Sequence, residues 1–348
     1  MRLIAFIIFA AITVGLVLLL NTKIVAPIPL GAILSPQHGL WQNAEAVDAD
    51  ISENLSFAGL KGKVDVYFDD RLVPHIIAEK DEDVYFVQGY IHAKFRLWQM
   101  EFQTHAAAGR VSELLGDTAL NFDRQKRRLG MVYAAENSLQ EMEKDPETKA
   151  ICDAYTAGIN NYIVGLTEAS LPVEYKLLGY KPEKWSNLKT ALFLKYMALD
   201  LAGYETDFEM TNAKSVFSMS DIVKLYPLLN DSLDPMVPRG TVYALPLLNI
   251  MPPATTDSLY LVPLDSVSIK ADKPDPANGS NNWAVAGSKT RSGSPILAND
   301  PHLGLNLPSL WYELQMSTPT FNAYGVSFPG APGVIIGFND SCAFGFTN

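Results

Sequence analysis

The chain changes character at one short stretch, Asn278-Gly279-Ser280-Asn281-Asn282-Trp283. Before it, residues 64–230 carry mostly helical periodicity. After it come short apolar runs separated by Gly, Pro, Asn and Asp. Taken alone, Asn-Gly-Ser-Asn-Asn predicts a turn ahead of a strand. The order of a helical part, a linker and a strand-rich part predicts an α+β fold.

Ser280 has a second interpretation because it directly follows Gly279. A serine hydroxyl can attack the preceding carbonyl, and glycine permits strained backbone and leaves that carbonyl accessible. Hydrolysis of the resulting ester would leave Ser280 with a free α-amine. An α-amine has a pKa near ~8, against about 10.4 for lysine. It can therefore accept the hydroxyl proton of its own residue, so that one residue supplies nucleophile and base. The GxSxG elbow of other serine hydrolases is absent from the sequence.

Residues 83–107 predict a long helix, because apolar residues recur at steps of three and four. These residues are Val84, Val87, Ile91, Phe95, Trp98 and Phe102. The acidic run 81–83 favours a helix start, and Gly109 favours the helix end. Further helices are predicted at 147–165, 187–202 and 208–229, and a pair of strands at 64–68 and 74–78.

Strands are predicted in the apolar runs at 283–286, 295–298, 311–316, 321–328, 334–337 and 342–347. Residues 231–279 are rich in Pro, Asp, Ser and Thr, which predicts a linker or a segment destined for removal. The chain stops directly after the last run, with no helix to cover the sheet. We therefore expect the natural protein to continue.

The first twenty residues stand apart by their hydropathy. From Leu3 to Leu20 the only polar residue is Thr13. Such a stretch is about the minimum for a membrane span and long for the apolar core of a cleaved signal. An uncleaved anchor is favoured over a cleaved signal, and either one exports the remainder. Residues 24–57 have the composition of a stalk.

Composition excludes several classes of protein. The formal net charge is −11, and so acidic a surface repels phosphate backbones, which excludes nucleic acid as a partner. Export permits a disulfide between Cys152 and Cys342, but two buried thiols are at least as well supported. No CxxC, HExxH or EF-hand loop is present, and the five histidines are scattered. A metal-dependent amidase therefore has no ligand cluster to support it.

Motifs along the chain resemble, in the same order, those of the penicillin acylase family of N-terminal-nucleophile hydrolases. The processing site is similar to Gly279-Ser280-Asn281-Asn282-Trp283-Ala284-Val285, and the segment that follows it to Ala298-Asn299-Asp300-Pro301-His302-Leu303. The other matches are Val73-Pro74-His75-Ile76, Gly89-Tyr90-Ile91-His92-Ala93, Arg96-Leu97-Trp98-Gln99-Met100-Glu101, Ala108-Gly109-Arg110, Pro329-Gly330-Ala331-Pro332-Gly333-Val334 and Gly337-Phe338-Asn339. Each motif is weak alone, and their shared order over residues 35–348 gives the resemblance its weight.

The resemblance implies the αββα fold of these hydrolases, with a core of stacked antiparallel β-sheets. It divides the chain into an anchor or signal (1–23), an entry segment (24–57), a helical α-subunit part (58–230), a spacer (231–279) and the start of an incomplete β-subunit (280–348). Cleavage of this zymogen between Gly279 and Ser280 would give an α/β heterodimer.

The resemblance also implies roles for single residues. Ser280 matches the nucleophile, and its freed amine the base. His302, 22 residues later, matches a position that carries His in cephalosporin- and acyl-homoserine-lactone-type members, where it would orient or activate Ser280. Its alternative is a satisfied histidine in an Asp-Pro-His turn. Asn348 matches the residue whose backbone N–H lines the oxyanion hole, while the second donor would lie beyond the chain.

Other residues receive weaker assignments. Glu209 resembles a glutamate that binds calcium in several members, and a solvent-facing carboxylate is its alternative. Phe338 stands where His usually precedes Asn339, so for Asn339 only a structural turn is expected. We expect packing or hydrogen-bonding roles for two other histidines and an ion pair for one arginine, namely His75, His92 and Arg110.

An amide hydrolase that works on linear amides through an acyl-Ser280 intermediate is thus implied, periplasmic or membrane-anchored, with no cofactor needed for its chemistry. Candidate substrates are β-lactam amides and N-acyl homoserine lactones, with an apolar acyl pocket lined partly by residues near 195–210. The alternative is a catalytically inactive, membrane-anchored binding or scaffold protein of the same fold. Such a protein would not need Gly279-Ser280.

Overall fold

A computed structural model describes residues 2–22, 24, 29–35, 39–44, 51–201, 207–227, 240–242 and 279–347. The chain divides into two compact units. The larger unit consists of Met1–Ala202 and Ala277–Asn348, and the smaller one of Gly203–Pro276.

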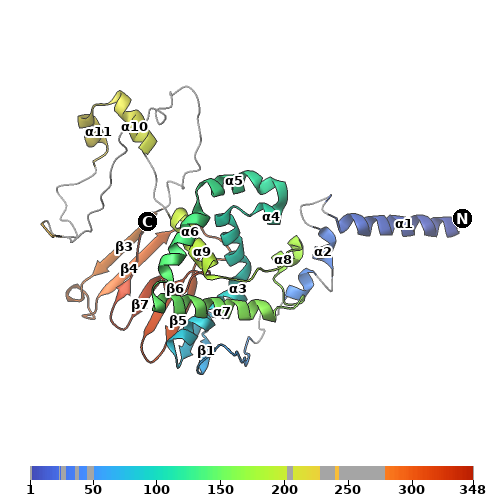
Figure 1. Cartoon of the computed structure of the whole chain (residues 1–348), viewed down its shortest axis with the longest axis horizontal. Helices are drawn as coiled ribbons and strands as arrows, with labels where there is room; N and C mark the ends of the chain where they lie inside the picture. Colours follow the sequence, from blue (N-terminus) through green and yellow to red (C-terminus); the bar gives the residue numbers. More distant parts are fainter. Residues whose placement is uncertain are drawn as a thin grey trace. The chain divides into compact units, whose positions relative to one another are not determined.

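Helices dominate the first part of the larger unit (Figure 1). They are α1 (Arg2–Leu20), α2 (Leu30–Leu34), the 3-10 turn η1 (Leu40–Asn43), α3 (Asp81–Ala108), α4 (Ser112–Leu115), the 3-10 turn η2 (Gly116–Ala119), α5 (Leu120–Arg128), α6 (Met131–Met142), α7 (Pro146–Gly165), α8 (Val173–Leu178) and α9 (Asn187–Asp200). The helices predicted at 83–107, 147–165 and 187–202 are confirmed as α3, α7 and α9. Within residues 64–202, no separate range was predicted for α4, α5, α6 or α8.

The smaller unit contains α10 (Asp207–Val216) and α11 (Met219–Leu225). The single helix predicted over 208–229 is wrong. It is interrupted at Ser218, which has extended backbone and whose Oγ accepts a hydrogen bond from the backbone N–H of Asp221. A serine in this position caps a new helix instead of continuing the old one.

Within the part of the chain that the structure describes, eight strands form two sheets. The six-stranded sheet has the order β1 (Val64–Phe68), β2 (Pro74–Ala78), β5 (Tyr312–Ser317), β6 (Asn322–Ser327), β7 (Ile336–Asn339) and β8 (Ala343–Phe344). The two-stranded sheet pairs β3 (Gly279–Val285) with β4 (Ile296–His302), and the 3-10 turn η4 (Gly287–Lys289) follows β3. The fold is therefore α+β, as predicted.

One pair of strands departs from the expected antiparallel core. β2 and β5 run parallel, with His75 opposite Gln315, whereas every other neighbouring pair is antiparallel. Parallel neighbours need a long connection, and here α3 to α9 and the smaller unit lie between the two strands in sequence. The parallel pair joins the first hairpin to the strands that follow Ser280.

The predicted turns at the edges of the two-stranded sheet are also wrong. β3 begins at Gly279, so Asn-Gly-Ser-Asn-Asn is strand from Gly279 onward. β4 continues to His302, so Asp-Pro-His is strand as well. Asparagine is disfavoured in strands because its amide competes for backbone groups. Here the amides of Asn282 and Asn299 instead bond to the backbone of residues 345 and 346.

Helix α3 is the centre of the larger unit. Its acidic first turn and its end at Gly109, which has φ 64°, agree with the prediction. One side packs on the six-stranded sheet, where Val84 and Phe86 lie against Ile76 and Leu314. Another side carries Leu97 and Met100 toward α7 and α8 in a second apolar cluster. The helix thereby connects the sheet to the helical layer.

Two glycines bring α3 and α7 into backbone contact. A methyl group on Gly89 would lie 2.1 Å from the carbonyl oxygen of Tyr155, and one on Gly158 would lie 1.8 Å from that of Phe86. Any larger residue would therefore force the helices apart.

A chain of hydrogen bonds runs through this buried contact. Tyr155 Oη accepts from the Gly330 N–H and lies 2.7 Å from His92 Nδ1. His92 Nε2 lies 2.9 Å from Ser327 Oγ, which donates to the Tyr312 carbonyl. Only one proton order satisfies every group: Tyr155 donates to Nδ1, and Nε2–H donates to Ser327. His92 is thus a neutral structural residue, as predicted, and burial lowers its pKa to about 3.

His75 and Asn339 have the structural roles predicted for them, and the two cysteines are unpaired. His75 Nδ1 lies 2.6 Å from Gln315 Oε1, which confirms a hydrogen-bonding role. Both cysteines are free thiols, but only Cys152 is buried, and Cys342 is exposed. Asn339 forms the expected turn, because its Oδ1 accepts from the backbone N–H groups of Ser341 and Cys342.

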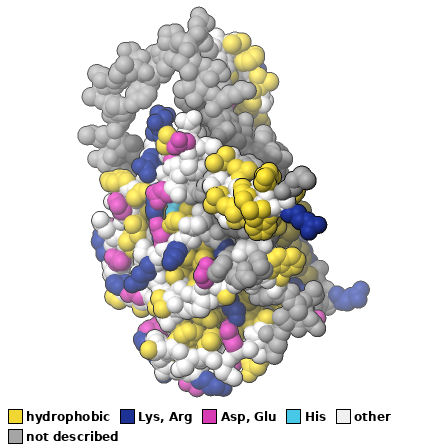
Figure 2. Space-filling view, turned by 90° about the vertical axis from the view of Figure 1, so that its right-hand side faces the viewer, with side chains coloured by type: hydrophobic (Ala, Val, Ile, Leu, Met, Phe, Trp, Pro, Cys, Tyr) yellow, Lys and Arg dark blue, Asp and Glu magenta, His cyan; other side chains and the backbone are white. Residues whose placement is uncertain are grey.

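Helix α1 exposes apolar side chains along its whole length. It has 19 residues, a mean hydropathy of 3.1 and no buried residue. Seen from the side of α1, the surface carries a dense group of hydrophobic side chains (Figure 2). Its length and composition suit a membrane span, and a signal sequence has the same properties.

Candidate active site

Ser280 lies at the start of β3, directly after Gly279. Its side chain is half-buried, and its hydroxyl donates a hydrogen bond of 2.6 Å to the carbonyl oxygen of Gly279. The Oγ atom therefore already lies beside the carbonyl of the bond expected to break. Attack on the carbonyl carbon first requires the hydroxyl to turn from the oxygen toward that carbon.

The strand register determines on which face of the two-stranded sheet the side chains of Ser280 and His302 lie. Gly279 pairs with His302, and Ser280 pairs with Pro301. Successive side chains of a strand point to opposite faces, so Ser280 lies on one face and His302 on the other. A methyl group on Gly279 would lie 3.9 Å from His302 Nδ1, which shows that the imidazole is on the side of Gly279. The two side chains thus do not face each other in the uncut chain.

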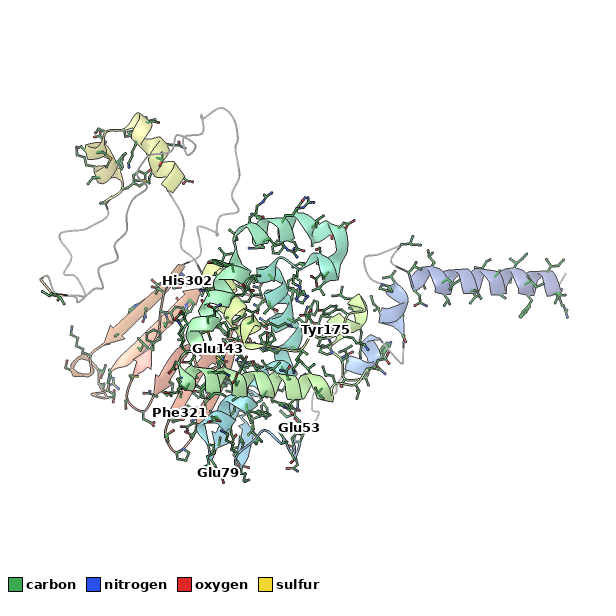
Figure 3. The ribbon with its side chains drawn as sticks, viewed as in Figure 1. Glu53, Glu79, Glu143, Tyr175, His302 and Phe321 are labelled. Atoms are coloured by element: carbon green, nitrogen blue, oxygen red, sulfur yellow. The ribbon has the colours of Figure 1, made fainter. Side chains whose placement is uncertain are left out.

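His302 lies at the end of β4, and 43% of its side chain is exposed (Figure 3). Its Nε2 is 2.9 Å from Asp300 Oδ2 and 3.2 Å from Asn281 Nδ2. A proton on Nε2 can be donated to Asp300, which leaves Nδ1, on the side of Gly279, as an acceptor. Asp300 was not predicted as a site residue, although its place two residues before His302 on one strand puts both side chains on one face.

The face that carries Ser280 also carries two asparagines. Asn282 and Asn299 are opposite one another in the register. The Nδ2 of Asn282 donates to the carbonyl of Gly345, and the Nδ2 of Asn299 donates to that of Phe346. The segment that follows β8 therefore crosses the Ser280 face. Neither asparagine was predicted to have a role, although both lie within the motifs that resemble the family.

For two predicted site residues the structure gives no geometry that tests the prediction. Asn348 lies outside the described residues. Glu209 is an exposed residue of α10 in the smaller unit. The predicted spacer also falls largely outside the described residues, as does part of the segment 195–210 expected to line the acyl pocket.

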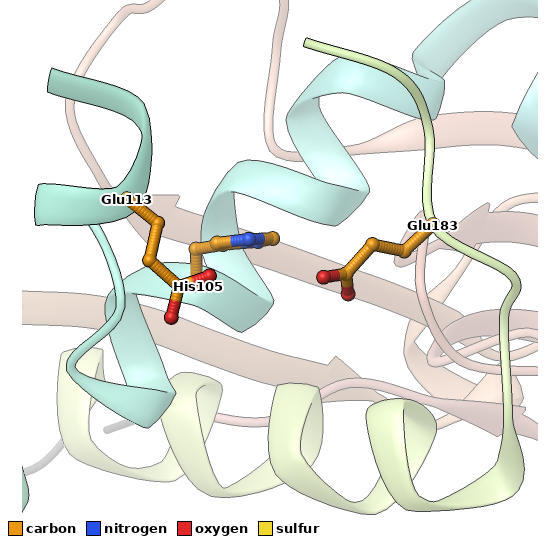
Figure 4. A group of neighbouring side chains, drawn as sticks. All are labelled: His105, Glu113 and Glu183. Atoms are coloured by element: carbon orange, nitrogen blue, oxygen red, sulfur yellow. The ribbon is translucent and has the colours of Figure 1, made fainter.

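A separate group of polar side chains lies at the end of α3, where His105, Glu113 and Glu183 place potential metal-ligand atoms within 4.8 Å of one another (Figure 4). Arg110 already bonds both carboxylates, with Nη2 2.7 Å from Glu113 Oε2 and 2.6 Å from Glu183 Oε1. A guanidinium that neutralises two of the three ligands opposes a metal cation there.

Lys189 extends this group into the core. Its Nζ lies 2.9 Å from Glu183 and 3.5 Å from Glu101, which is buried and accepts a hydrogen bond from the Tyr175 hydroxyl. Hydrogen bonds from Arg110, and then from Lys189, hold the pKa of Glu183 well below its usual range. The group is an ion-pair network that ties α3 to the residues before α9, which confirms the predicted structural role of Arg110.

Comparison with known proteins assigns the chain to a family. Residues 63–348 match the family model described as penicillin amidase. The chain belongs to the penicillin amidase family. The resemblance drawn from the order of its motifs is thereby confirmed.

Individual relatives in the penicillin amidase family match most of this chain. Penicillin acylase 2 proenzyme of Pseudomonas sp. (strain SE83) is 32% identical over 292 residues, which is 81% of this chain and 36% of that protein. Acyl-homoserine lactone acylase QuiP of Pseudomonas aeruginosa is 33% identical over 267 residues, 76% of this chain and 30% of that protein. The chain spans about a third of the length of these relatives.

A solved structure is similar over about half of this penicillin amidase family chain. The thermostable penicillin G acylase from Alcaligenes faecalis is 21% identical, with a TM-score of 0.42, over 52% of this chain and 100% of that chain.

Proposed function

We propose that this chain carries the nucleophile of a self-processing acyl-amide hydrolase, Ser280, which cleavage after Gly279 exposes as a new N-terminus. The observation that carries the proposal is the contact of 2.6 Å between Ser280 Oγ and the Gly279 carbonyl oxygen, at the first residues of β3. Membership of the penicillin amidase family supports it. A relative named as a proenzyme also fits a chain that must be processed.

The cleavage step uses only groups of this chain and one water. Ser280 Oγ attacks the Gly279 carbonyl carbon, and the hydroxyl proton passes to the departing nitrogen of Ser280. The C–N bond breaks, and an ester joins Gly279 to Ser280 Oγ. Water hydrolyses this ester to the Gly279 carboxylate, which restores the hydroxyl and leaves a free α-amine.

The freed α-amine then serves the second reaction. With a pKa near ~8 it is partly neutral at pH 7, so it can take the proton of the Ser280 hydroxyl as that oxygen attacks a substrate amide. The amine product leaves with a proton, and an acyl ester forms on Ser280. Water, activated by the same α-amine, releases the acid.

His302 belongs to the second reaction rather than to the first. In the uncut chain it lies on the opposite face from Ser280. Cleavage makes Ser280 a chain terminus, whose backbone is no longer held by the preceding residue. The hydroxyl can then turn toward the imidazole, where Nδ1 accepts a hydrogen bond from it if Nε2–H is bonded to Asp300. His302 would thus orient the hydroxyl whose proton the α-amine takes. The backbone N–H of Asn348 is proposed as one oxyanion donor.

The proposed substrates rest on the names of the relatives, and the proposed location rests on helix α1. The printed names of two relatives point to penicillins and acyl-homoserine lactones, so we propose acylated amines of these two kinds as substrates. The exposed apolar helix α1 supports export with retention at the membrane, and cleavage would give an α/β heterodimer.

A structural calcium ion at Glu209 is proposed only together with further oxygen ligands from outside the described residues. A calcium ion takes six to eight oxygen ligands, and Glu209 alone can supply at most two. No catalytic step needs the ion.

The test is to express the complete gene product and to determine the N-termini and masses of its fragments. We expect one fragment that begins at Ser280, and none from the Ser280→Ala variant. An intact chain in the wild type would contradict the proposal. It would favour the alternative of a scaffold protein that keeps the fold without catalysis.

A further inference from the structure

The two-stranded sheet is joined to the end of the six-stranded sheet by the asparagine pair, Asn282 and Asn299. The Nδ2 of Asn282 donates to the Gly345 carbonyl at 2.7 Å, and the Nδ2 of Asn299 donates to the Phe346 carbonyl at 3.0 Å. The second proton of the Asn299 amide goes to the Asn281 carbonyl, also at 3.0 Å. Two side chains that face each other across the strands thus hold two consecutive peptide groups.

The contact between this pair and the segment is very close. A methyl group on Gly345 would lie 2.8 Å from Asn299 Cβ and 2.9 Å from its Cγ. Real Cβ atoms do not approach other carbons so closely. Glycine at position 345 therefore lets the backbone lie directly on the Asn299 side chain.

The asparagine pair lies on the same face of the two-stranded sheet as the Ser280 side chain. Ser280 and Asn282 are two residues apart on β3, and side chains with this spacing share a face. The backbone of Gly345 and Phe346 is consequently held on the same face of β3–β4 as the Ser280 hydroxyl. His302 and Asp300 occupy the other face.

We propose that Asn282 and Asn299 are positioning residues that set the backbone of residues 345–347 relative to Ser280. This inference rests on the proposed function, in which a backbone N–H just after this segment stabilises the oxyanion. Backbone donors contribute only when they are held at hydrogen-bond distance from the developing charge. A displacement of about 1 Å can cost on the order of 100-fold in rate.

The experiment separates positioning from simple folding. In the complete gene product, Asn299→Asp and Asn282→Asp keep the shape of each side chain but replace its donor by an acceptor. Gly345→Ala disturbs the same contact from the other side. Asn161→Asp is the matched control, because the exposed Asn161 on α7 also donates its Nδ2 to a backbone carbonyl, that of Ala157.

Three quantities are measured for each variant. The first is the rate at which the Ser280 N-terminus forms in a cell-free translation reaction. The second is kcat and KM of the cut protein on acyl p-nitroanilides with chains from acetyl to dodecanoyl. The third is the thermal midpoint of each variant in an uncut Ser280→Ala background, which reports the contribution of the asparagine pair to folding.

We expect each of the three variants, Asn282→Asp, Asn299→Asp and Gly345→Ala, to lower kcat about 10- to 100-fold, with KM changed less than about twofold. The control should stay within about twofold of the wild type. If Asn282→Asp, Asn299→Asp and Gly345→Ala all kept the wild-type kcat, the inference would be overturned. Cleavage at Ser280 in the same proteins would still support the proposed function. A kcat loss accompanied by an equal rise in KM and a collapsed thermal midpoint would also overturn the inference. A wild-type chain that never cuts would overturn both.

Discussion

His302 stands directly across the β3–β4 pair from Gly279, yet its side chain lies on the opposite face from that of the neighbouring Ser280. The uncut chain therefore keeps the imidazole away from the hydroxyl that must attack Gly279. Strand alternation, rather than distance along the chain, produces this separation. Because of this separation, a change at His302 is expected to affect hydrolysis of the substrate but not cleavage of the chain.

We predict that His302→Ala still forms the Ser280 N-terminus within about threefold of the wild-type rate. Hydrolysis of an acyl p-nitroanilide by the cut protein should fall by about 10- to 100-fold, because the imidazole orients the Ser280 hydroxyl while the α-amine remains as the base. Both rates are measured on the same preparation. A variant that fails to cut would show that the imidazole reaches Ser280 before cleavage.

Buried His92 should make stability depend on pH. Its folded pKa is lowered to about 3, below the ordinary value near ~6.5 of an unfolded histidine. The unfolded chain binds the proton first, so the stability due to neutral His92 is complete above pH ~6.5. It is lost as the pH falls toward 3, by up to ~1.4 kcal/mol per unit.

His92→Gln tests this dependence, because glutamine also offers one donor and one acceptor to Ser327 and Tyr155 but does not titrate. Urea unfolding of the uncut Ser280→Ala background between pH 7.5 and 5 should show a shallower loss for the variant. Its stability at pH 7.5 should be about 1–3 kcal/mol lower, because the amide cannot fill the imidazole site. Equal slopes for both proteins would show that another group causes the acid loss.

The ion-pair network at the end of α3 should contribute more than the surface pairs. We predict that Arg110→Met lowers the free energy of unfolding by about 1–3 kcal/mol, because Glu183 and Glu113 lose their shared cation. Lys144→Met is the control, since its pair with Glu141 is 68% and 72% exposed and should contribute under about 0.5 kcal/mol. Equal losses for the two variants would contradict this ranking.

The helices and strands that could be predicted are those marked by patterns of neighbouring residues. The acidic first turn and Gly109 define α3, and its apolar period identifies the buried face. Contacts between distant segments were not predictable in this way. The parallel pairing of β2 with β5 and the bonds from Asn282 and Asn299 to residues 345 and 346 join segments with no common period. The hydrogen-bond partner of such an asparagine can be identified only once the three-dimensional arrangement of the strands is known.

The glycine contact between α3 and α7 gives a further test, with its control on the same helix. Gly158→Ala would place a methyl group 1.8 Å from the Phe86 carbonyl oxygen, whereas a methyl group on Gly165 meets no atom within 4 Å. We predict that Gly158→Ala lowers the free energy of unfolding by about 1–3 kcal/mol or more, since the backbone must move. Gly165→Ala should be neutral or stabilise by up to about 1 kcal/mol, because alanine has less freedom to lose in the unfolded chain. Chemical denaturation of the two variants in the Ser280→Ala background measures both values. A Gly158→Ala protein as stable as its Gly165→Ala counterpart would mean that the two helices are not in backbone contact.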